Sequence, residues 1–100
     1  MPPRQFRIHI APEVLAQLRA AIQTAAAHGR RADAVHAALK IEDGLRWLAD
    51  ELGESRYPLK RFGELRVVLI GPIGAVYAVH RGRMEVNVGR LVLMGATRRR

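Results

Sequence analysis

The chain of 100 residues contains no cysteine and only five aromatic side chains. The absence of cysteine excludes disulfide scaffolds, thiol nucleophiles, zinc ribbons and iron–sulfur clusters. The scarcity of aromatic rings excludes a platform on which the bases of a single-stranded nucleic acid would stack one after another. Binding of single strands through stacked bases is therefore not expected.

Long apolar runs and acidic residues are also scarce. The longest apolar runs, such as 67–70 and 91–94, fall far short of the roughly 18 consecutive residues that a membrane span needs. The first residues lack the apolar core of a signal peptide, so we expect a soluble, cytoplasmic protein with no membrane partner. Nine acidic residues stand against 17 lysines and arginines, which gives a net charge of +8. This excess favours polyanions or an acidic protein segment as partners.

Composition divides the chain into two halves. Twelve of the 15 alanines lie within 11–49, whereas nine of the 15 valines and isoleucines lie within 66–94. Alanine favours helices and β-branched residues favour strands, so we expect helices first and a sheet afterwards. The net charge is +2 in residues 1–50 and +6 in residues 51–100. We expect a single domain over 1–100 whose second half faces the partner, with residues 95–100 as a flexible basic tail.

The first half opens with a strand and a helix. Residues 5–10 alternate between apolar and polar side chains, which is the period of a half-buried strand. Pro12 suits the first turn of a helix, because its missing N–H has no intrahelical partner there. Apolar side chains then follow at helical spacing, so the pattern predicts a helix from Pro12 to about His28.

A second helix is expected between Asp33, which can cap it, and Gly53, which lies past its end. Its apolar positions keep steps of three and four residues and form one continuous stripe. Gly44 costs up to about 1 kcal/mol inside a helix relative to alanine. Because Gly44 follows Asp43, itself a candidate cap, a break at this point stays open as an alternative.

Three strands are expected in the second half, over 65–70, 75–79 and 84–94, with short glycine-containing turns between them. Gly89 predicts a bulge or a close approach within the last strand. The predicted order is therefore strand, helix, helix, strand, strand, strand. This order defines an α+β fold with an N-terminal strand, two helices and a three- to four-stranded antiparallel sheet.

Groups for acid–base or metal chemistry are scattered. The acidic residues lie mainly on predicted helix ends and polar faces, and the four histidines stand singly, so no metal site is expected. The segment Gly71-Pro72-Ile73-Gly74 joins two strands and lacks the spacing of a nucleotide-binding loop. We therefore expect no cofactor.

The basic residues from Lys60 onward are mostly arginines. A guanidinium donates two parallel hydrogen bonds to a phosphate and keeps its charge near neutral pH. An arginine-lined sheet face therefore suits backbone phosphates or a phosphorane-like transition state. A solvated polar face is the ordinary alternative. The set comprises Lys60, Arg61, Arg66, Arg81, Arg83, Arg90, Arg98, Arg99 and Arg100.

The order of elements and the segment 71–79 resemble the RelE/ParE superfamily of bacterial toxins. The matching strand of that family reads Gly-x-x-Arg-x-x-Tyr-x-Val, and here Tyr77 and Val79 stand at its end. The family's final Val-x-Val strand ends in Gly-Arg, as residues 86–90 do here. The resemblance covers 5–94. It implies a small basic toxin that a cognate antitoxin protein neutralises; RelE-like members cut messenger RNA in the ribosome, and ParE-like members inhibit DNA gyrase.

The resemblance also implies site residues. In the cutting reaction a ribose 2′-OH attacks the adjacent phosphate, and cationic groups, with no metal, stabilise the extra negative charge. On the matching positions the candidates are Lys60 and Arg61 before the sheet, Arg66 on its first strand and Arg90 on its last.

Two departures from the family leave the function open. Gly74 stands where the family usually carries an arginine, and residues 91–94 are apolar where cutting members often carry a tyrosine or a histidine. The alternatives are an RNA endonuclease, a gyrase inhibitor, and a non-catalytic nucleic-acid or protein-binding module on the same fold. A structural or assembly protein with incidental basicity completes the set.

Overall fold

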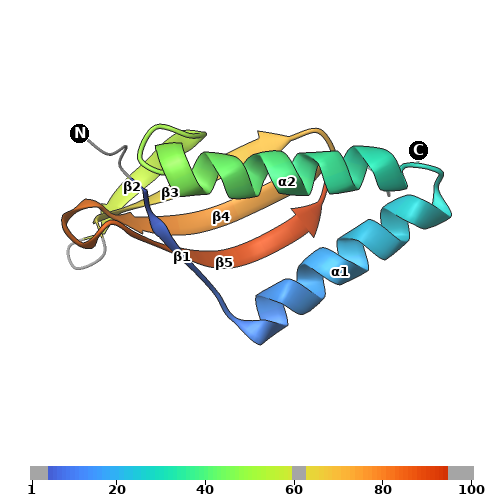
Figure 1. The fold of residues 1–100 in the computed structure, drawn as a ribbon, viewed down its shortest axis with the longest axis horizontal. Coiled ribbons are helices and arrows are strands. Elements are labelled where there is room, and N and C mark those ends of the chain that lie inside the picture. Colours follow the sequence, from blue (N-terminus) through green and yellow to red (C-terminus); the bar gives the residue numbers. More distant parts are fainter. Residues whose placement is uncertain (1–4, 60–62, 95–100) are drawn as a thin grey trace.

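The computed structural model describes residues 5–59 and 63–94 (Figure 1). Its elements, in chain order, are β1 (Arg7–Ile10), α1 (Pro12–Ala27), α2 (Arg31–Leu48), β2 (Glu54–Leu59), β3 (Gly63–Ile70), β4 (Ile73–His80), the short 3-10 turn η1 (Arg81–Arg83) and β5 (Glu85–Leu93). The two helices pack on one side of the sheet (Figure 1). Of the helices described, neither has the length and apolarity to cross a membrane.

The sheet has five strands in the order β1-β5-β4-β3-β2. The pairs β2–β3, β3–β4 and β4–β5 are antiparallel, but β1 pairs with β5 in parallel. The expected antiparallel sheet is therefore corrected to a mixed one. Parallel strands cannot be joined by a tight turn and need a long crossover connection. Here the two helices form the first part of the chain that leads from β1 to the rest of the sheet. Alternation of side chains reports which face is buried and carries no information on strand direction.

The second correction is β2, for which no strand was expected. This segment contains Pro58, which cannot donate a hydrogen bond to a neighbouring strand. The proline is tolerated because β2 is the last strand of the sheet and pairs on one side with β3 alone.

The helices differ from expectation at their ends. Helix α1 begins at Pro12 as predicted and ends one residue before His28. Helix α2 begins at Arg31, so Asp33 is not its cap; the Asp33 carboxylate lies in the first turn, where the helix dipole favours negative charge. The helix also continues through Gly44. A Cβ at that position would lie 2.8 Å from a methyl carbon of Leu52, so the glycine makes room for that side chain.

Small side chains bring the helices close to the sheet. The layer between them is filled from the sheet by larger residues, of which the biggest fully buried ones are Tyr77, Ile73, Val79 and Val86. Helix α1 packs along β5, where the side-chain oxygen of Gln17 accepts the backbone N–H of Leu91 at 3.0 Å. The helices contribute buried alanines at Ala21, Ala25, Ala34 and Ala37.

The predicted irregularity at Gly89 is a β-bulge. Val76 pairs with Arg90, whereas the next residue, Tyr77, pairs with Val88, so Gly89 is the extra residue of β5. The extra residue changes which side chains point inward. Val88 stays buried under the helices, and Arg90 is turned to the opposite, open face of the sheet.

Gly53 provides a test of the junction between α2 and β2. Its φ is 67°, and a Cβ there would collide with the carbonyl oxygen of Val67. We expect Gly53→Ala to lower the free energy of unfolding by about 3 kcal/mol or more, because backbone must move in addition to the left-handed strain.

Gly29→Ala is the matched control, since Gly29 has a φ of 71° with no atom within 4 Å of a Cβ. Gly29→Ala should lower the free energy of unfolding only by the cost of the left-handed backbone strain, about 1 to 2 kcal/mol. Urea denaturation measures both losses. Equal losses would contradict the close approach at Gly53.

Candidate functional site

The two predicted site residues that the structure describes, Arg66 and Arg90, lie on opposite faces of the sheet. Lys60 and Arg61 lie outside the described residues. Arg66 pairs with Tyr77 and Arg90 pairs with Val76, which are consecutive residues of β4. Since consecutive residues of a strand point to opposite faces, Arg66 lies under the helices and Arg90 lies on the open face. The two described candidates therefore do not approach a common phosphate.

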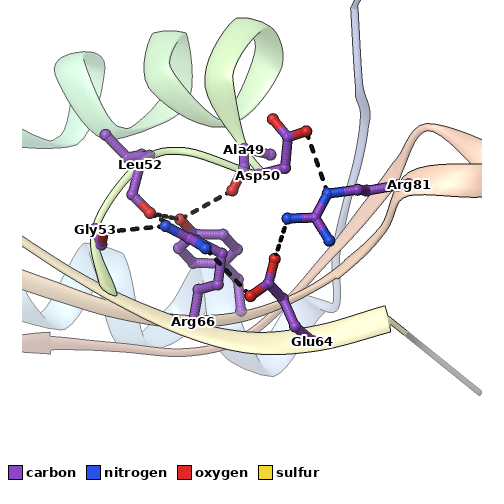
Figure 2. A network of polar contacts seen from close by, with 8 residues as sticks. Ala49, Asp50, Leu52, Gly53, Glu64, Arg66 and Arg81 are labelled. Atoms are coloured by element: carbon purple, nitrogen blue, oxygen red, sulfur yellow. Dashed lines mark hydrogen bonds and ion pairs between the residues drawn. The ribbon is translucent and has the colours of Figure 1, made fainter. Parts of the chain in front are cut away.

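Arg66 is committed to contacts inside the protein. The residue is 8% exposed. Its Nε donates to the carbonyl of Leu52 at 2.9 Å, and its Nη2 donates to the carbonyl of Gly53 at 3.0 Å (Figure 2). Its Nη1 donates to the carboxylate of Glu64 at 3.2 Å. The guanidinium thus ties the segment that follows α2 to β3.

Glu64 joins this buried arginine to a second, more exposed one. One carboxylate oxygen accepts from Arg66 and the other accepts from Nη2 of Arg81. Arg81 also donates through Nε to Asp50 at 3.3 Å (Figure 2). The side chain of Arg81 is 53% exposed and that of Glu64 is 12% exposed. The network therefore reaches solvent at Arg81.

The surroundings of Glu64 favour its charged form. A hydrogen bond with the Ser55 side chain makes the largest contribution; burial opposes it, and the charges of Arg81 and Arg66 add to it. Together they hold the pKa of Glu64 below its ordinary value of 4.5. A carboxyl group whose pKa lies below the ordinary range is a poor general acid at neutral pH.

Tyr77 completes the polar cluster from β4. Its side chain is fully buried, and its hydroxyl donates to the carbonyls of Ala49, at 3.2 Å, and Leu52. These carbonyls follow the last residues of α2, where backbone acceptors lack intrahelical donors. Burial raises the pKa of Tyr77 above its ordinary value of 10.0, so the hydroxyl stays protonated and serves as a donor.

The open face of the sheet is apolar around Gly74. A Cβ at Gly74 would lie 3.1 Å from Cγ of Met94 and 3.5 Å from a methyl carbon of Val92. The nearby side chain of Leu69 is 60% exposed. The position at which the resemblance places an arginine thus lies among aliphatic side chains.

Arg90 is exposed beside this apolar surface. Across the described ranges, 5–59 and 63–94, no ion pair involves it. The same ranges contain no group of three acidic or histidine side chains that could hold a metal ion. Of the two described candidates, Arg90 is thus the one that solvent can reach.

The polar cluster that sequence reasoning missed consists of Glu64, Asp50 and Arg81. One signal was present, because Glu64 and Arg66 alternate in phase with Val68, a core residue. The alternate residues of β3, which include Leu65 and Leu69 and lie on the other face of the sheet, are equally apolar. Periodicity alone could not decide which set was buried.

No family model, curated protein or solved structure matches this chain. The resemblance to the RelE/ParE superfamily therefore rests on the order of the elements and on the short motifs around Tyr77 and Arg90.

Replacement of Arg66 tests its structural role. Arg66→Met removes three hydrogen bonds and leaves the Glu64 carboxylate without one of its two arginine partners. We expect the free energy of unfolding to fall by about 3 to 5 kcal/mol, the usual effect of removing one partner of a buried pair.

The matched control is Arg83→Met, because Arg83 is exposed and only its backbone N–H makes a hydrogen bond in the described residues. Its free energy of unfolding should fall by no more than about 0.5 kcal/mol. Chemical denaturation of both variants decides, and similar losses would remove Arg66 from its structural role.

The pKa of Glu64 predicts how stability depends on pH. Its folded-state pKa lies below 4.5, so its contribution is present above the unfolded-state pKa and is lost as the pH falls through the folded-state value. In Glu64→Gln this part of the acid sensitivity should disappear. Unfolding free energies from neutral to acidic pH measure it, with Glu51→Gln, at an exposed position, as the control. An unchanged acid sensitivity in Glu64→Gln would contradict the role of this carboxylate.

Proposed function

We propose that this protein is the toxin of a toxin–antitoxin pair and that it acts in the cytoplasm by binding its target rather than by cutting RNA. Three features support the toxin assignment: the net charge of +8, the strand–helix–helix order before the main sheet, and the tyrosine-strand motif that ends at Val79. The cognate antitoxin would be its neutralising partner.

The inward position of Arg66 is the observation that supports binding over cleavage. Cleavage of a phosphodiester requires several groups that converge on the charge developing at phosphorus. Arg66 donates to Leu52, Gly53 and Glu64 instead. Gly74, where the resemblance places an arginine, lies among apolar side chains. Among the described candidates, Arg90 alone is directed to solvent. One guanidinium suits recognition of an anionic target better than it suits catalysis.

The polar part of the open face lies beside Arg90, where β1 and β5 run side by side. His9 pairs with Asn87, and Arg7 pairs with Glu85, so all four share the face of Arg90. This stripe combines polar groups with the ion pair between Arg7 and Glu85, and it fits a complex of protein and nucleic acid. DNA gyrase on DNA, the target of ParE-like toxins, is therefore the proposed target, and ribosome-dependent cleavage of messenger RNA is the alternative.

Expression of the chain alone in bacteria tests the proposal. We expect growth arrest with DNA-damage signalling and with no ribosome-dependent cuts in messages mapped by primer extension. Arg90→Ala should raise the dose that causes arrest by roughly tenfold, as expected for loss of one charge-assisted hydrogen bond. Arg19→Ala, at an exposed position of α1, is the control and should leave the dose unchanged.

Two results would reject the proposal in different ways. Unimpaired growth at high soluble expression would exclude a toxin. Ribosome-dependent message cuts at the arresting dose would keep the toxin but exclude action by binding.

A further inference from the structure

One row of side chains crosses four strands on the open face of the sheet. Glu54 of β2 pairs with Val67, Val67 pairs with Val76, and Val76 pairs with Arg90. Directly paired residues share a face and lie side by side. The row therefore reads acidic, apolar, apolar, basic from β2 to β5.

The two charged ends of this row cannot pair within one copy of the chain. Three strand spacings of about 4.8 Å separate them. Glu54 and Arg90 are both exposed, and neither has an ion pair in the part of the chain that the structure describes. Each end of the row is thus a single uncompensated charge beside apolar surface.

We propose that a second copy of this chain covers the open face, with a two-fold axis along the strands between β3 and β4. Such an axis reverses the order of the row, so Glu54 of each copy lies opposite Arg90 of the other. Val67 of each copy lies opposite Val76 of the other. A two-fold dimer forms each contact twice, which gives two ion pairs around four valines.

The neighbouring row fits the same axis. Leu69 pairs with Gly74, and Gly74 pairs with Val92. Leu69 is 60% exposed, whereas Gly74 has no side chain. The axis places Leu69 of one copy against the side chains that cover Gly74 of the other, which are those of Val92 and of Met94, itself 45% exposed. In this row, too, apolar side chains of the two copies meet.

The geometry also agrees with how sheets pack. Two sheets packed face to face keep their strands within about 30° of each other and lie about 10 Å apart. An axis along the strands produces this aligned arrangement. The net charge of +8 on each copy opposes association. As for any dimer, the fraction that associates depends on protein concentration. If the proposed function holds, the dimer also hides Arg90 from the target.

Reversal of the two charges tests the dimer in purified protein. Glu54→Arg and Arg90→Glu each place like charges opposite one another twice, so each variant should weaken self-association by about tenfold or more. An equimolar mixture of the two variants should associate again, because every substituted position then faces an opposite charge. Sedimentation equilibrium over a range of concentrations measures all three samples.

Helix-face variants with the same charge changes serve as controls. Asp43→Arg and Arg19→Glu lie at exposed positions of α2 and α1 and should leave self-association unchanged. Circular dichroism shows that each variant is folded. Recovery in the mixture supports the proposal whatever the outcome of the growth assay.

Three results would overturn the dimer. The first is a wild-type chain that stays monomeric at every concentration. The second is a mixture that associates no better than its components. The third is an equal weakening by the helix-face controls, since net charge and not the row would then explain the effect.

Discussion

The fold depends on the buried pairing of Arg66 with Glu64 and with the carbonyls that follow α2. A guanidinium out of water must have its donors satisfied, and here Leu52, Gly53 and Glu64 accept from all three of its nitrogens. The same contacts hold the segment that leads from α2 into β2. Tyr77 adds a donor from β4 to the same segment. One charged side chain thereby links the helical layer to the middle of the sheet.

This arrangement separates two kinds of surface. On the helix side, cations are used for structure and are compensated by acidic groups and carbonyls. On the open side, the bulge at Gly89 turns Arg90 outward without exposing the core residue Val88. The open face can therefore offer charge and apolar area to a partner while the core stays intact. The proposed recognition of an anionic target and the proposed pairing with a second copy would both use this face, so they would compete.

Much of the fold followed from the sequence, because periodicity predicted both helices and the strands around Val68 and Val86, and Gly89 predicted a bulge or a close approach within the last strand. The parallel placement of β1 did not, since strand direction leaves no trace in alternation. Strand β2 was hidden by Pro58, which an edge strand tolerates. The site was less predictable than the fold. The number of arginines predicts a basic surface. It does not show that the guanidinium of Arg66 donates its hydrogen bonds to protein groups 14 or fewer positions away in the sequence.

Arg66 is a structural cation, and we propose Arg90 as the recognition cation. Side-chain NMR of the arginine Nε–H groups tests both assignments most directly. The account predicts that the Arg66 Nε–H exchanges slowly with solvent and keeps its chemical shift when a phosphate-bearing oligonucleotide is added, while the Arg90 signal moves. Rapid exchange at Arg66, together with a shift of its signal on addition of the oligonucleotide, would contradict the account.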